Sequence, residues 1–235
     1  MSNMTESRGP EVYVLDIDGT LMHTHEIDNH CYWEAVHEVY GFRSGDEELI
    51  SFRHISDSGI LQEWCQRSLG RDPLETEVSE IRRLFLRLME SISAEQPELF
   101  TPRPGLEPWL EAMTRHNGIR LAIATGSWGN TAAYKLEFSG LARFGLALAS
   151  ADDAVSRADI MSIALARLEL EAPPENHRIT YIGDGPWDYR ACRELGWSFI
   201  GIAEGERAAA LLELGAGRVE ADFRNLARYD GNLVR

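Results

Sequence analysis

The stretch Val12-Tyr-Val-Leu-Asp-Ile-Asp-Gly-Thr-Leu21 decides the fold of this 235-residue chain. Its first four residues are apolar and β-forming, as expected for a strand that is buried on both faces of a parallel sheet. Asp16 and Asp18 follow directly, beside a glycine that favours a turn. Ligands of doubly wound sheets bind at the carboxyl ends of the strands, so this stretch predicts a site at that edge.

Further short apolar runs recur along the chain, and most of them are separated by stretches of helical character. They span residues 121–124, 146–149, 179–182 and 199–202. Strands that alternate with helices are typical of a parallel sheet with crossover connections. The sequence therefore predicts an α/β fold, with a Rossmann-like parallel sheet as its core and helices on both faces.

Residues 23–100 interrupt this alternation with helical patterns. Apolar residues at helical spacing predict an amphipathic helix over residues 75–93, and a second helix is predicted over residues 57–68. We expect a core domain of residues 1–22 and 101–235 and an all-helical cap domain of residues 23–100. An insertion after the first strand enters above the ligand edge of the sheet, although a peripheral decoration is the alternative.

Composition limits the classes of partner. The formal net charge is −15, which argues against nucleic acid, since its binders neutralise phosphates with Lys and Arg. It argues equally against an anionic membrane surface, and no apolar run is long enough to span a bilayer. The polar residues 1–10 show no signal-peptide pattern, and the 3 cysteines form no CxxC motif. These features predict a cytoplasmic protein with buried thiols.

A second acidic loop, Gly183-Asp-Gly-Pro-Trp-Asp188, follows another apolar run. Several carboxylates at adjacent strand ends repel one another, and a hard divalent cation with oxygen ligands relieves that repulsion. The sequence predicts a Mg²⁺ site that includes Asp16, Asp18, Asp184 and Asp188. Mg²⁺ fits because it uses few carboxylates and keeps positions for water and phosphate.

The order and spacing of the two acidic motifs resemble the haloacid dehalogenase superfamily, in its phosphatase branch with a helical cap after the first motif. The resemblance extends from about Val12 to Leu226. It implies that Asp16 is the nucleophile that forms an aspartyl-phosphate. It also implies that Asp18 is the general acid and base and holds the metal through its backbone carbonyl. An acid at position 18 favours phosphate chemistry over carbon–halogen cleavage.

The resemblance also implies a phosphate-binding Thr or Ser at the end of a buried strand, which matches Thr125 with the Gly126 amide; the Ser127 hydroxyl is the alternative. The family's third motif normally supplies a lysine, and here the sequence departs from it, because Arg157 is the cation in that region. We interpret Arg157 as the functional cation, with a surface residue at a helix start as the alternative. The single lysine, Lys135, falls in the helix after the second motif.

In the fourth motif the resemblance makes Asp184 a direct metal ligand. Asp188 is either a more distant acidic group of the metal site or the partner that orients Arg157. In the cap, Arg53 and His54 are candidates for contact with the group beyond the phosphate, and a solvated loop is the alternative.

These features together predict a Mg²⁺-dependent phosphatase that hydrolyses a small phosphomonoester and is similar to phosphoglycolate phosphatases. One alternative is a phosphomutase of the β-phosphoglucomutase type. Another is a catalytically weak member that serves as a binding or regulatory module. The expected partner is a small phosphorylated metabolite, and the expected assembly is a monomer or homodimer.

Overall fold

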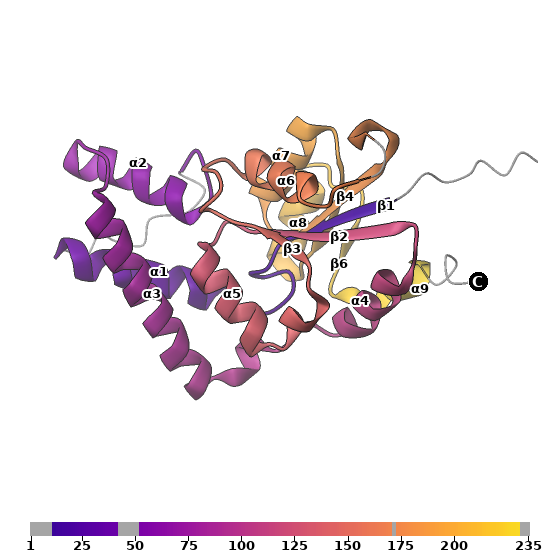
Figure 1. Cartoon of the computed structure of the whole chain (residues 1–235), viewed down its shortest axis with the longest axis horizontal. Coiled ribbons are helices and arrows are strands. Elements are labelled where there is room, and N and C mark those ends of the chain that lie inside the picture. Colours follow the sequence, from indigo (N-terminus) through magenta and orange to yellow (C-terminus); the bar gives the residue numbers. More distant parts are fainter. Residues whose placement is uncertain (1–10, 42–51, 171–172, 231–235) are drawn as a thin grey trace, which may run out of the picture.

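The structure is a computed structural model that describes residues 11–41, 52–170 and 173–230 (Figure 1). In this part of the chain all strands are parallel and form one sheet of 6 strands in the order β3-β2-β1-β4-β5-β6. The strands are β1 (Glu11–Leu15), β2 (Ile119–Ala124), β3 (Ala147–Ala149), β4 (Arg178–Gly183), β5 (Ser198–Ile202) and β6 (Val219–Glu220). The predicted strands are confirmed, and the two-residue β6 is too short to leave a pattern in the sequence.

Helices cover both faces of the sheet, which confirms the predicted α/β class. Tyr13 and Leu15 of β1 point to one face, where they share a core with helices α4 (Leu106–Arg115), α5 (Gly129–Phe138) and α9 (Phe223–Asp230). Val12 and Val14 point to the other face and pack with α6 (Arg157–Ala166) and α7 (Pro186–Leu195). The alternation of side chains along a strand explains this division. The remaining core elements are α8 (Gly205–Glu213), η3 (Leu141–Phe144) and η4 (Pro174–Asn176).

The segment between β1 and α4 is helical in its described residues, and Figure 1 shows its helices gathered at one end of the molecule. It contains α1 (His25–Tyr40), α2 (Asp57–Leu69), α3 (Glu75–Glu95) and the short η2 (Pro97–Phe100). The helices predicted over residues 57–68 and 75–93 are thus present as α2 and α3. The division into a core and a cap domain with the boundaries given above stays a prediction.

Local sequence explains where these helices begin and end. Ser56 caps α2, and its side chain accepts the backbone N–H of Gly59 at 3.2 Å. Gly41 and Gly70 end α1 and α2 in the left-handed conformation that glycine adopts without strain. In α3 the buried residues Ile81, Phe85, Met89 and Ser93 recur every fourth position, so one face of the helix packs inward.

An aromatic cluster joins these helices to the core. Tyr32, Trp33, Trp64 and Phe85 are buried together with Trp128, which precedes α5 of the core. The ring centroids of Phe85 and Trp128 are 6.3 Å apart. The helices above the sheet and the loop after β2 therefore share one hydrophobic core.

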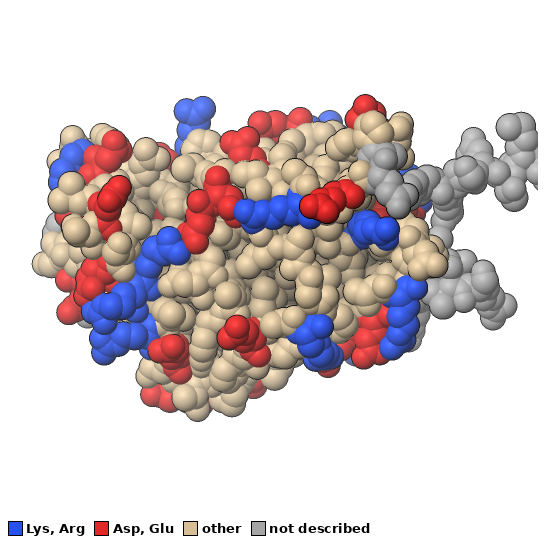
Figure 2. All heavy atoms as spheres, viewed as in Figure 1, with Lys and Arg blue, Asp and Glu red and all other residues tan. Residues whose placement is uncertain are grey.

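Several exposed charges form ion pairs. Arg83 bonds Glu80 on α3, and Arg143 bonds Glu107. Figure 2 shows basic side chains beside acidic ones on the viewed face.

None of the described helices combines the length and the apolar character needed to cross a membrane. Cys31, Cys65 and Cys192 are buried free thiols.

Replacement of Phe85 by alanine should lower the free energy of unfolding by about 3–5 kcal/mol, because it opens a cavity in the shared aromatic cluster. Leu212→Ala, at a side chain that is 55% exposed, should change it by less than about 0.5 kcal/mol. Urea unfolding followed by tryptophan fluorescence measures both. Equal, small effects would contradict the shared core.

Candidate active site

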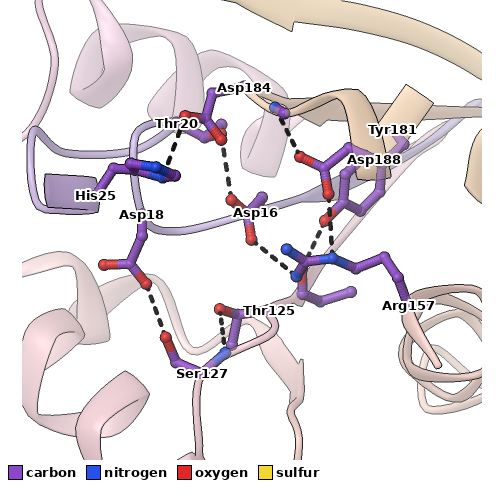
Figure 3. Close-up of polar contacts among 12 residues, drawn as sticks. Asp16, Asp18, Thr20, His25, Thr125, Ser127, Arg157, Tyr181, Asp184 and Asp188 are labelled. Atoms are coloured by element: carbon purple, nitrogen blue, oxygen red, sulfur yellow. Dashed lines mark hydrogen bonds and ion pairs between the residues drawn. The ribbon is translucent and has the colours of Figure 1, made fainter. Parts of the chain in front are cut away.

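The predicted acidic motifs meet at one edge of the sheet (Figure 3). Asp16 follows β1, Thr125 follows β2 and Asp184 follows β4, and these three strands are neighbours in the sheet. Arg157 is the first residue of α6, whose N-terminus reaches the same edge. The carboxyl ends of adjacent parallel strands thus bring together residues that are far apart in the sequence.

Asp16 is buried at the centre of the site, with 3% of its surface exposed. Its Oδ1 lies 3.3 Å from Nη1 of Arg157, and its Oδ2 lies 3.5 Å from the Thr20 hydroxyl. Burial raises the pKa of Asp16 well above its usual value, and the carboxylates of Asp188 and Asp184 raise it further, whereas Arg157 opposes the rise. Arg157 is therefore the group that favours the carboxylate form of Asp16 against these effects.

Arg157 is itself fixed by Asp188. The Nε atom of Arg157 lies 3.1 Å from Oδ1 of Asp188, which is fully buried. The other carboxylate oxygen of Asp188 accepts the backbone N–H of Gly185 at 3.1 Å. This geometry supports Asp188 as the residue that orients Arg157, and a direct role of Asp188 at a metal stays a prediction.

Asp18 has a different environment from Asp16. Its Oδ1 accepts the Thr24 hydroxyl at 2.5 Å, and its Oδ2 accepts the Ser127 hydroxyl at 2.9 Å and the ammonium of Lys135 at 2.5 Å. Burial alone would raise the pKa of Asp18, but the charge and hydrogen bond of Lys135 lower it below its usual value. Asp18 is thus held as a carboxylate.

Lys135 is a site residue that sequence reasoning missed. It is fully buried, and its ammonium also donates to Asp28 at 2.7 Å and to the Ser127 hydroxyl at 3.0 Å. The three N–H bonds of an ammonium thus meet three acceptors. The signal in the sequence that could have indicated Lys135 is composition, because Lys135 is the one lysine among 23 basic residues.

The acidic cluster fits a hard divalent cation. Carboxylate oxygens of Asp16, Asp184 and Asp188 lie within 4.8 Å of one another. Oδ1 of Asp184 is buried and has no hydrogen-bond partner among the described residues. Gly19, at φ +82°, makes room for this carboxylate, because a Cβ there would lie 2.0 Å from Oδ2 of Asp184. Burial, and then Asp188, raise the pKa of Asp184 to about 7, which is the strain that a cation relieves.

The predicted phosphate-binding residues line the same pocket as Asp16 and Asp18. The backbone N–H of Ser127 is bonded to the Thr125 hydroxyl at 3.2 Å, and the Ser127 hydroxyl is engaged with Asp18. Gly126 allows a close approach, since a Cβ there would lie 3.0 Å from Nη1 of Arg157. This arrangement favours Thr125 and the Gly126 amide over the Ser127 hydroxyl as phosphate donors.

Arg53 and His54 are not brought to this pocket. They line a neighbouring groove, which shares Arg157 and Trp187 with it. The volume of the pocket is about 60 Å³, and the volume of the groove is about 380 Å³. A contact of Arg53 or His54 with substrate stays a prediction.

Residues 23–100 supply further pocket residues: Asp28, Asn29 and Tyr32 on α1, Ile55 and Ser56 before α2, and Asp57 and Ile60 in α2. His25 also lines the pocket; its Nδ1 lies 3.6 Å from Oδ2 of Asp184 and its ring stacks on Trp187. Burial and Arg207 lower the pKa of His25 to about 4, so it is neutral near pH 7.

Comparison with known proteins identifies the family. The model of the haloacid dehalogenase-like hydrolase family matches residues 13–202, so the chain belongs to this family of hydrolases. The predicted superfamily and the prediction of an enzyme are thereby confirmed. No curated protein sequence matches the chain.

Three solved structures illustrate the likeness of fold. A hydrolase from Pseudomonas syringae is 20% identical, with 90% of this chain and 94% of that chain covered and a TM-score of 0.67. CbbY from Rhodobacter sphaeroides, in complex with phosphate, is 24% identical, with 92% and 96% covered and a TM-score of 0.69. A putative β-phosphoglucomutase from Thermotoga maritima is 21% identical, with 89% and 94% covered and a TM-score of 0.54. At these identities the comparison shows a shared fold.

Mg²⁺ should stabilise the protein more at about pH 8 than at about pH 5. A folded-state pKa above the ordinary 3.8, as for Asp184, means that stability is lost as pH rises from about 4 to about 7. Mg²⁺ binds the deprotonated carboxylates and so offsets that loss of stability. At a free Mg²⁺ concentration of 100 times its Kd, binding contributes about 2.7 kcal/mol. Thermal unfolding with and without Mg²⁺ at both pH values measures the difference.

In that experiment Asp184→Asn should abolish the shift caused by Mg²⁺. Asp153→Asn, which changes the charge equally in an ion pair with Arg167, should retain it. A shift of the same size in Asp184→Asn and the unmodified protein would contradict the assignment of the metal site.

Lys135→Met should lower the free energy of unfolding by about 3–5 kcal/mol, because it leaves Asp18 and Asp28 buried without their counter-charge. The matched control is Arg83→Met, whose pair with Glu80 is exposed and screened by water, so this change should have a much smaller effect. Urea unfolding near pH 7.5 compares the two variants. A loss below about 1 kcal/mol for Lys135→Met would show that the buried network does not stabilise the fold.

Proposed function

We propose that the protein is a Mg²⁺-dependent phosphatase that hydrolyses a small phosphomonoester through an aspartyl-phosphate at Asp16. The observation that carries this proposal is that two carboxylates of one pocket, the buried Asp16 and the mostly buried Asp18, each pair with a different cation. Asp16 lies 3.3 Å from Arg157, and Asp18 lies 2.5 Å from Lys135. The two carboxyl groups can therefore take different roles, one as nucleophile and one as acid and base.

In the first step an Asp16 oxygen attacks phosphorus, and the bond between phosphorus and the ester oxygen breaks. Asp18 takes up a proton as the phosphate binds and then gives that proton to the departing oxygen, so that an alcohol leaves and Asp18 becomes a carboxylate. Lys135 favours the carboxylate form of Asp18, and the charge of the incoming phosphate opposes Lys135 and raises the proton affinity of Asp18. Arg157 and the Gly126 amide bind the phosphoryl oxygens as charge develops on them.

In the second step water attacks phosphorus, and Asp18, now a carboxylate, takes the proton from that water. The bond between Asp16 and phosphorus breaks, which releases phosphate and restores the carboxylate. The proposed metal ligands are the carboxylates of Asp16 and Asp184 and the backbone carbonyl of Asp18. Asp188 lies behind them. When bound, Mg²⁺ offsets the negative charge of the phosphoryl group.

A fold neighbour supports a phosphate ligand. CbbY from Rhodobacter sphaeroides, which shares this fold at 24% identity, is described in complex with phosphate. A small phosphorylated metabolite is therefore the proposed substrate. A phosphomutase would share the first step and return the phosphoryl group to a sugar. Slow hydrolysis of simple esters with fast isomerisation of a phosphosugar would identify that alternative.

Asp16→Asn should lower kcat for a chromogenic aryl phosphate by at least about a thousandfold, because the amide cannot act as the nucleophile. The purified chain is assayed with and without Mg²⁺, and circular dichroism checks that the variant is folded. Asp72→Asn, an equal change of charge at an exposed position, should keep full activity. Retained activity in Asp16→Asn would disprove the nucleophile assignment.

A further inference from the structure

One wall of the pocket that contains Asp16 comes from the inserted helices. Asp28, Asn29 and Tyr32 of α1 lie on it, together with Asp57 and Ile60 of α2. If the phosphate sits at Asp16, the alcohol part of the ester must point toward this wall. The chemistry of the wall therefore selects the alcohol.

Both carboxylates of the wall are held in place through one oxygen. Asp28 accepts the ammonium of Lys135 at 2.7 Å, and Asp57 accepts the backbone N–H of Trp128 at 2.7 Å. The helix dipole at the first turn of α2 favours a negative charge on Asp57. Burial, and then Asp28, nevertheless raise the pKa of Asp57 well above its usual value, and burial and Asp18 raise the pKa of Asp28 to about 7. Hydrogen-bond donors or positive charge on a ligand therefore favour the charged forms of both groups. The wall thus offers a ligand fixed acceptors of hydrogen bonds.

Positive charge is scarce at the wall. Among the described residues that line the pocket, Arg157 is the one that carries a positive side chain, and it lies between Asp16 and Asp188. Lys135 stands behind the wall and already donates to three acceptors. Arg53 faces the neighbouring groove. A carboxylate or a second phosphate on the alcohol would be buried beside two aspartates without a cation to pair with.

We infer that the substrate is a phosphomonoester of a small alcohol that carries hydrogen-bond donors, hydroxyl or ammonium, and no second negative charge. This inference rests on the proposed phosphatase function and narrows it. It replaces the expected similarity to phosphoglycolate phosphatases in one respect, because phosphoglycolate carries a carboxylate on its alcohol part. Asp28 and Asp57 act as the specificity-determining residues, through attraction of donors and repulsion of anions.

The experiment compares kcat/KM of the full chain with Mg²⁺ for glycerol 3-phosphate, ethanolamine phosphate and phosphoglycolate, and an aryl phosphate reports phosphatase activity as such. At least one of the first two should exceed phosphoglycolate by about tenfold or more. If the aryl phosphate is hydrolysed but phosphoglycolate equals or exceeds both donors, the phosphatase stands and the inference is overturned. If no ester is hydrolysed, the proposed function fails and the inference falls with it.

Variants test the cause of the selectivity. Asp57→Asn keeps an acceptor for the Trp128 N–H, and it should reduce the disadvantage of phosphoglycolate several-fold. Asn29→Arg adds a cation on α1 and should also reduce the disadvantage of phosphoglycolate. This second variant does not depend on the folding of Asp57→Asn. Asp72→Asn should leave the ratio unchanged. An unchanged ratio in both folded pocket variants would overturn the roles of Asp28 and Asp57.

Discussion

The burial of several carboxylates at one edge of the sheet is the constraint around which this protein is arranged. Asp16, Asp18, Asp184 and Asp188 lie within or beside one pocket, and at most a small part of each is in contact with water. In a medium of low dielectric constant such groups repel one another strongly. The fold tolerates them because buried cations stand among them. The strain that remains is typical of sites that bind a metal or carry out catalysis.

Two buried cations of different shape pair with Asp16, Asp18 and Asp188, and the exposed Arg207 pairs with Asp184 at 2.9 Å. Arg157 has a planar head that spans Asp16 and Asp188, and its long side chain lets it reach them from the start of α6. Lys135 has a compact head whose three N–H bonds serve Asp18, Asp28 and Ser127. The two side chains are not interchangeable, because a guanidinium cannot direct its donors to three converging acceptors in this way. Asp16 and Asp18 thus each have a separate cation, although the charge of Asp18 still raises the pKa of Asp16.

The start of α2 is bonded to the core loops that carry the site. The Ser56 hydroxyl donates to the carbonyl of Val155 at 2.6 Å, and the Ser58 hydroxyl donates to the carbonyl of Ala151 at 2.8 Å. The backbone N–H of Asp57 donates to the carbonyl of Gly126 at 2.8 Å. The inserted helices thereby enclose the pocket next to the phosphate-binding loop, and separation of the two parts must break these bonds. Enclosure keeps bulk water from the site and strengthens its electrostatic interactions.

The sequence predicted those features that depend on local patterns. Apolar runs gave the parallel strands, helical spacing gave α2 and α3, and the acidic motifs gave Asp16, Asp18 and Asp184, because motif residues that follow parallel strands must meet at one edge. Arg157 could be proposed from its position, but only the structure places it between Asp16 and Asp188.

Lys135 and Asp28 carry no motif that reveals their place beside Asp18. The tertiary structure alone decided that α5 and the inserted helices turn these side chains toward Asp18 and the space above it. It also placed Arg53 and His54 beside a separate groove. The physical reason is that the positions and the ends of the strands depend on short stretches of sequence. The packing angle of an inserted helix depends instead on contacts between residues far apart in the chain.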